Sequence, residues 1–193
     1  MQSIIKSILV LSLVVFVNGC KEESAEAVKE PEVINGYLLP PEPDETLNNS
    51  TLLGIDSNDN GVRDDVERLI IIEESKNPNF PKTHTALSLQ YAGAWQKVLN
   101  NPTLDSRINL EKHASCKRYF KKKYTRDMSF SDIMKWKKEN KTVLGIKIED
   151  KIFNTKLRIE QSFEFNQACS GNIFDLPPAE LSACQINIDE LGE

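Results

Sequence analysis

A stretch of twelve residues, from Asp56 to Glu67, limits what this chain can fold into more tightly than any other feature. It places acidic and amide side chains at alternate positions, with Gly61 where the chain has to turn sharply. Calcium takes about six to eight oxygen ligands at about 2.3–2.6 Å, which a short loop supplies through such alternation. We therefore predict a calcium (Ca²⁺) site. The expected ligands are the side chains of Asp56, Asn58, Asn60, Asp64 and Glu67 and the backbone carbonyl of Val62.

The spacing D-x-N-x-N-G-x5-E in this stretch resembles the EF-hand loop, and it is similar to the solitary calcium loops of thrombospondin type 3 repeats and dockerin modules. The resemblance covers twelve of the 193 residues and implies calcium binding. The eighth loop position is Arg63, where paired EF-hands usually have an aliphatic residue, so an unpaired loop is expected. Pro41 and Pro43 disfavour an incoming helix. We expect an EF-hand-like loop with only the exit helix.

An alternative that needs no metal explains the same residues. Asp and Asn side chains hydrogen-bond to their own backbone in turns, so the stretch would be an Asx-rich turn that caps a helix beginning near Asp64. If the site does bind calcium, only Asp56, Asp64 and Glu67 contribute charge. We therefore expect weak affinity, with a dissociation constant of about 10⁻⁴–10⁻³ M, and a structural clamp instead of a sensor.

The N-terminal residues predict export. Residues 1–19 contain one lysine, Lys6, followed by an apolar run of the length typical of a signal-peptide core. The sequence Val17-Asn18-Gly19-Cys20 resembles a bacterial lipobox, which implies that Cys20 is lipidated and becomes the mature N-terminus. Lys21 follows it, and by analogy with enteric bacteria this favours the outer membrane. The alternative is an ordinary signal peptide or a short membrane anchor.

Residues 20–51 and residues 52–193 differ in composition. The first segment is acidic, contains several prolines and has few aromatic residues, so we predict a disordered tether. Docking of Ile34, Tyr37, Leu38 and Leu39 on the domain stays open as an alternative. The second combines the calcium loop with helical patterns of apolar residues, and we predict a mainly α fold, a small helical bundle. Helices are expected at about 64–76, 81–99, 103–120, 130–136 and 154–169, whereas residues 141–148 fit either a strand or a helix.

Three cysteines remain when Cys20 is set aside, and an exported protein is expected to oxidise two of them. All three pairings of Cys116, Cys169 and Cys184 stay open. The chain-entropy model favours Cys116 with Cys184, which closes the longer loop, although strain can outweigh that gain. The spacing fits neither a redox C-x-x-C pair nor a zinc site.

Basic residues are concentrated between positions 107 and 147, where thirteen Lys and Arg face four Asp and Glu, whereas the whole chain carries a net charge of −5. This asymmetry favours contact with an anionic glycan, a lipid or an acidic protein, and export excludes nucleic acid. The residues expected to make that contact are Lys117, Arg118, Lys121, Lys122 and Lys123. The alternative is a solvated face that the acidic segments neutralise.

No catalytic motif is recognisable. The chain has two histidines, His84 and His113, neither with a metal-ligand partner four residues on, and it has no G-x-S-x-G, H-E-x-x-H or phosphate-binding glycine loop. We therefore expect a non-catalytic binding or accessory lipoprotein of the bacterial envelope. The alternative is a periplasmic or surface hydrolase whose site the sequence does not mark.

Overall fold

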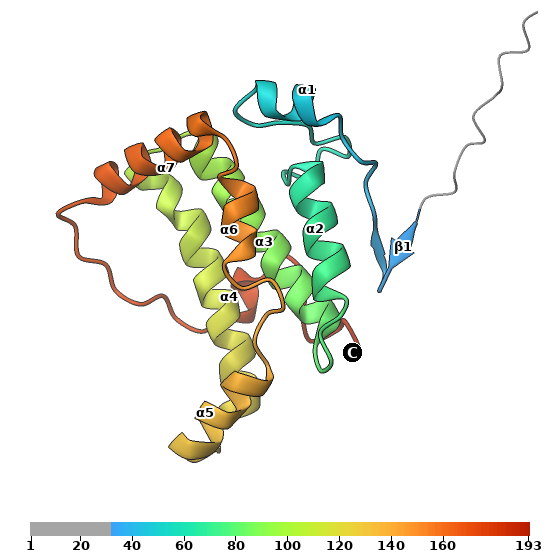
Figure 1. Ribbon diagram of the computed structural model, residues 1–193. Coiled ribbons are helices and arrows are strands. Elements are labelled where there is room, and N and C mark those ends of the chain that lie inside the picture. Colours follow the sequence, from blue (N-terminus) through green and yellow to red (C-terminus); the bar gives the residue numbers. More distant parts are fainter. Residues whose placement is uncertain (1–31) are drawn as a thin grey trace, which may run out of the picture. The chain divides into compact units, whose positions relative to one another are not determined.

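The computed structural model describes residues 32–193, and over this range the protein is mainly helical, as predicted (Figure 1). The longest helices, α3 and α4, pack against each other, and α2 packs on the other side of α3. Within these residues no helix has both the length and the apolar character required to cross a bilayer. The helices are α1 (Glu45–Ser50), α2 (Asp64–Glu74), α3 (Pro81–Asn100), α4 (Arg107–Thr125), α5 (Phe130–Glu139), α6 (Lys147–Ile152) and α7 (Lys156–Cys169), with single 3₁₀ turns η1 (Leu104–Ser106) and η2 (Leu181–Ala183).

The described part of the predicted tether is folded, which corrects that prediction for residues 32–51. Strands β1 (Val33–Ile34) and β2 (Tyr37–Leu38) form an antiparallel hairpin. Its turn is Asn35-Gly36, both with positive φ, as a tight two-residue hairpin turn requires. Beyond the hairpin, Glu42 forms an ion pair with Arg68 of α2, and α1 follows. These contacts bring the segment onto the domain, while residues 20–31 lie outside the described residues.

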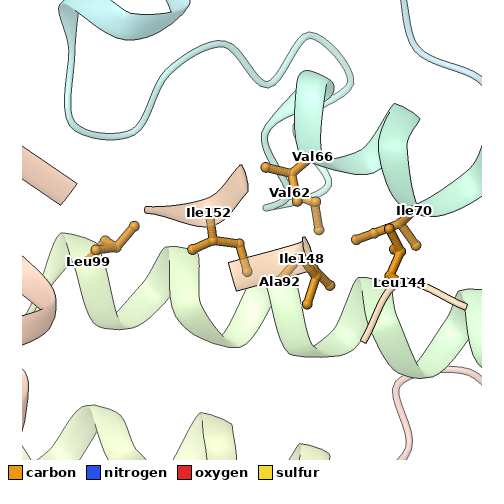
Figure 2. Close-up of a cluster of buried hydrophobic side chains, with 8 residues drawn as sticks. All are labelled: Val62, Val66, Ile70, Ala92, Leu99, Leu144, Ile148 and Ile152. Carbon is orange, nitrogen blue, oxygen red and sulfur yellow. The ribbon is translucent and has the colours of Figure 1, made fainter. Parts of the chain in front are cut away.

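One hydrophobic core joins the predicted loop to α2, α3 and α6 (Figure 2). Val62 comes from the loop itself and lies beside Val66 of α2 in this cluster. Apolar packing of Val62 therefore holds the loop against the core. The buried members are Val62, Val66, Ile70, Ala92, Leu99, Leu144, Ile148 and Ile152.

A second cluster lies between α3, α4 and the C-terminal segment, and it contains a disulfide between Cys116 and Cys184. This is the pairing that the chain-entropy model favoured, because it closes the longer loop. Cys169, on α7, is a free thiol and partly buried. At the very end of the chain, the Glu193 carboxylate accepts hydrogen bonds from the backbone N–H groups of Lys82 and Thr83, in the first turn of α3. The disulfide and this contact hold the C-terminal segment against the helices.

Local capping signals account for several helix ends. The conformation of the segment at residues 141–148, whose sequence fits either a strand or a helix, instead depends on a distant residue. Residues 141–146 are not helical, and α6 begins at Lys147. The fully buried Glu74 carboxylate accepts hydrogen bonds from the backbone N–H groups of Val143 (3.0 Å) and Leu144 (3.2 Å). A buried acceptor in α2 therefore shapes a turn about seventy positions later in the chain.

Removing the disulfide should destabilise the domain, because it frees a loop of 68 residues in the unfolded chain. We expect the Cys116→Ala/Cys184→Ala double variant to lose about 2–5 kcal/mol of unfolding free energy, measured by urea denaturation. Cys169→Ala is the matched control, since it removes a thiol but no cross-link, and it should lose clearly less. Equal losses in the two variants would contradict the expectation.

Candidate metal centre

The first half of the predicted calcium loop, residues 56–61, is a tight turn built around one carboxylate. Asp56 Oδ1 accepts a hydrogen bond from the Asn60 backbone N–H (3.2 Å), and its Oδ2 accepts from the Gly61 N–H (2.8 Å). Asp59 and Gly61 have positive φ values of 52° and 84°. Glycine adopts this conformation at least cost, which is why the chain needs it at this position.

Three further predicted ligands fold back onto the loop backbone. Asn58 Oδ1 accepts from the Asn60 N–H (3.2 Å), and Asn60 Oδ1 accepts from the Val62 N–H (2.8 Å). Asp64 Oδ1 accepts from the Ser57 N–H (3.0 Å) and so closes the loop across its base. The metal-free alternative requires such bonds, so they do not by themselves distinguish it from a calcium site.

The carboxylates at the base of the loop distinguish the two alternatives better. The Asp64 side chain is fully buried, and its Oδ2 has no hydrogen-bond partner among the described residues. The Glu67 side chain is only 5 % exposed. Within residues 32–193 no ion pair is formed by Asp56, Asp64 or Glu67. A buried charge without a partner is costly, so this arrangement suits a cation.

The electrostatic environment of Glu67 leads to the same conclusion. Burial raises the pKa of its carboxyl group above the ordinary value, hydrogen bonds from the Asn60 and Asn58 amides lower it, and the negative charges of Asp64 and Asp56 raise it further. The Asn58 amide nitrogen donates to Glu67 Oε2 at 3.2 Å. An amide N–H group thus provides part of the positive potential that three neighbouring carboxylates require.

The donor set fits a hard cation. Its atoms are carboxylate, amide and carbonyl oxygens, which suit calcium or magnesium better than zinc or copper. No group of three or more His, Cys, Asp or Glu side chains in residues 32–193 comes close enough together to hold a metal. A site here therefore depends on the amides of Asn58 and Asn60 and on the carbonyl of Val62 as well as on the acids.

Arg63 is a structural residue that the sequence pattern marked only as a departure from the loop family. Its side chain is 1 % exposed, and its Nε donates to Asp65 Oδ1 at 2.5 Å. The guanidinium also donates to the backbone carbonyls of Lys151 (2.7 Å) and Ile152 (3.5 Å), at the end of α6. Arg63 thereby connects the loop to residues nearly ninety positions later in the chain.

Arg158, also fully buried, holds the residues that precede the loop in the sequence. It donates to the backbone carbonyls of Asn48 (2.6 Å), Thr51 (3.1 Å) and Leu52 (2.9 Å), which follow or end α1. Burial lowers the pKa of Arg158 to about 10, and the positive charge of Arg63 acts in the same direction. It therefore stays charged at neutral pH. No signal in the sequence distinguishes this arginine from an exposed helical one.

The five basic residues predicted to contact an anionic surface do not form one group. Lys117, Arg118 and Lys121 line a common cavity. Lys123 instead forms an ion pair with Asp189 at 2.7 Å, and Lys122 lies on the exposed side of α4 outside that cavity. The predicted lipidation residue, Cys20, lies outside the described residues.

Comparison with family models, curated proteins and solved structures finds no match to this chain.

Arg63→Met should strongly destabilise the domain, because it leaves Asp65 buried with one fewer cation and the carbonyls at the end of α6 without their donor. We expect a loss of about 3–5 kcal/mol of unfolding free energy in urea denaturation, as for other broken buried ion pairs. Lys156→Met is the control. Lys156 is exposed and pairs with the half-exposed Glu160, so its loss should be at most about 1 kcal/mol. Similar losses would show that Arg63 does not anchor the loop.

Proposed function

We propose that this protein is a lipid-anchored protein of the bacterial cell envelope, held to the outer membrane through Cys20, whose helical domain is stabilised by calcium bound to residues 56–67. Its role is non-catalytic binding. The observation that carries the calcium proposal is the fully buried Asp64 carboxylate, whose Oδ2 has no hydrogen-bond partner in the described part of the chain. The lipobox at residues 17–20 supports the anchor.

The proposed ligands are oxygens of residues within the twelve-residue loop. They are the side chains of Asp56, Asn58, Asn60, Asp64 and Glu67 and the carbonyl of Val62. A bound calcium ion supplies the positive charge that offsets the three carboxylates. For this, the Asn58 amide has to present its oxygen to the ion and give up its hydrogen bond to Glu67. That exchange, together with only three charged ligands, favours weak binding.

The loop is well placed for calcium to affect the stability of the whole domain. Val62 packs in the core with α2, α3 and α6, and Arg63 is bonded to the end of α6. Any free energy gained by holding the loop in this conformation is therefore gained by the folded domain and not by an isolated loop. This is the behaviour of a structural clamp, which acts by binding the folded state only.

Calcium at about 10 mM should raise the unfolding free energy of the domain by about 1.4–2.7 kcal/mol, if the dissociation constant is about 10⁻⁴–10⁻³ M. The measurement is urea denaturation of residues 32–193, with and without calcium, together with calorimetric titration. These residues lie within one compact unit. No change in the unmutated domain would refute the proposed clamp.

Glu67→Gln should abolish the calcium effect, because it removes a charged ligand at the base of the loop. Asp59→Asn is the matched control, since it removes a carboxylate from the same loop at a position not expected to bind the ion. Asparagine also tolerates the positive φ of residue 59. The control should keep the calcium response. Loss of the response in both variants would indicate a general charge effect.

The anchor is tested separately on the full chain in a bacterial host. We expect the protein to sediment with the outer membrane and the mature N-terminal peptide to carry acyl chains on Cys20, detected by mass spectrometry. The Cys20→Ser variant should lose both. A soluble, unmodified protein would remove the anchor from the proposal and leave the calcium clamp untouched.

A further inference from the structure

The domain contains a cavity of about 720 Å³, which lies within the size range of small-molecule binding sites. It is bordered by α3, α4, α5, the residues that lead into α6 and the first turn of α6. Leu176 and Pro177 complete it. Much of its lining is aliphatic or aromatic. These residues are Leu87, Phe120, Trp136, Leu144, Ile148 and Leu176.

Cations surround this apolar lining. Lys117, Arg118 and Lys121 come from α4, and Lys137 and Lys141 come from α5 and the residues after it. In the part of the chain that the structure describes, none of the five forms an ion pair. The one acidic residue in the lining is Glu149, whose Oε1 already accepts a hydrogen bond from the Tyr91 hydroxyl at 2.7 Å. The cavity therefore has a strong excess of positive charge.

Lys121 of α4 and Lys137 of α5 both line the cavity. The pKa of Lys121 is lowered, chiefly by its contact with Lys137. Neighbouring like charges repel, and an anion bound between them would be attracted to both. The pair thus marks the part of the cavity that suits a negative group.

Two histidines line the cavity. His84 is 3 % exposed, and neither of its ring nitrogens has a hydrogen-bond partner among residues 32–193; the same holds for His113 Nδ1. Burial lowers the pKa of both rings to about 4, and the charge of Lys117 acts in the same direction. Each ring is therefore neutral at pH 7 and has one N–H to donate. Buried polar groups usually have a partner, so the N–H of His84 also suits a bound acceptor.

We propose that this cavity binds an anionic amphiphile with one apolar chain and a carboxylate or phosphate head, as in a fatty acid or a lysophospholipid. The chain would occupy the apolar lining between α3 and α4, and the head would lie between Lys121 and Lys137. An inorganic anion would leave the apolar surface uncovered, and a neutral lipid would leave five cations unpaired. The site uses none of the proposed calcium ligands, so it stands or fails independently of the clamp.

The first test is calorimetric titration of residues 32–193 with sodium dodecanoate and with dodecyl phosphate, both below their micelle concentrations. We expect one molecule to bind per domain. Dodecyl maltoside, which has the same chain and no charge, and inorganic phosphate, which has no chain, should each bind at least about tenfold more weakly. Equal binding of the neutral compound would overturn the proposal, because charge would then play no part.

The second test separates the cavity from the general basic character of the helices. Lys121→Gln/Lys137→Gln should weaken dodecanoate binding about tenfold or more. Lys122→Gln/Lys138→Gln is the matched control, since it removes the same charge from the same two helices outside the cavity, and it should leave binding unchanged. Ala114→Phe, which reduces the cavity volume without changing charge, should also weaken binding. Each variant is compared only if its thermal unfolding midpoint stays close to that of the unmutated domain.

Vesicles that contain phosphatidylglycerol provide the contrasting result. If the domain binds them, loses that binding equally in both double variants and shows no one-to-one complex with dodecanoate, the cations form a diffuse surface for membranes. That outcome would overturn the proposed cavity site. A saturable complex that only the Lys121 and Lys137 pair weakens supports it.

Discussion

The ion pair and hydrogen bonds of the buried Arg63 guanidinium are the interactions on which the rest of the described structure depends. The last carbonyls of a helix have no partner inside it, and its C-terminal end carries negative potential. Arg63 supplies donors to the carbonyls at the end of α6 and a positive charge at the same point. Asp65 balances that charge, and Lys151 adds a second ion pair to Asp65 at 3.0 Å. A single side chain therefore joins the loop, α2 and α6.

Neighbouring acids in this region behave differently because their surroundings differ. Burial alone would raise the pKa of Asp65, but hydrogen bonds and the charges of Arg63 and Lys151 lower it below the ordinary value. Glu67, two residues later, is also buried, faces other carboxylates and has a raised pKa. Arg63 and Lys151, the basic residues near the loop, therefore both pair with Asp65. Neither forms an ion pair with Glu67. The acids on the other side are the ones that the sequence pattern assigns to calcium.

Sequence reasoning succeeded where structure is determined locally. Ser129 and Thr155 accept hydrogen bonds from the backbone three residues on, as capping residues do, and the helices begin after them. The mainly helical fold follows from such signals and from apolar periodicity. The hairpin at Asn35-Gly36 also has a local signal, a strong one for a two-residue turn, which the composition-based prediction of a tether did not consider.

Features that depend on distant partners could not be predicted from the sequence. The turn at residues 141–146 depends on Glu74, and the assignment of basic residues depends on Asp189, which pairs with Lys123 from 66 positions away. A count of charges gives the excess between residues 107 and 147 but does not show which lysines share a cavity. The same limit applies to Arg63 and Arg158, because their partners are mostly backbone carbonyls, which every residue carries.

These contacts also determine how much calcium can matter to the fold. The turn hydrogen bonds around Asp56, the packing of Val62 and the bonds of Arg63 already hold the loop backbone without an ion. A domain of this size is stable by about 5–15 kcal/mol, and the proposed weak calcium binding would add only about 1–3 kcal/mol. Breaking a buried ion pair costs about 3–5 kcal/mol. The buried charges therefore contribute more to the formation of the loop than the proposed calcium ion would.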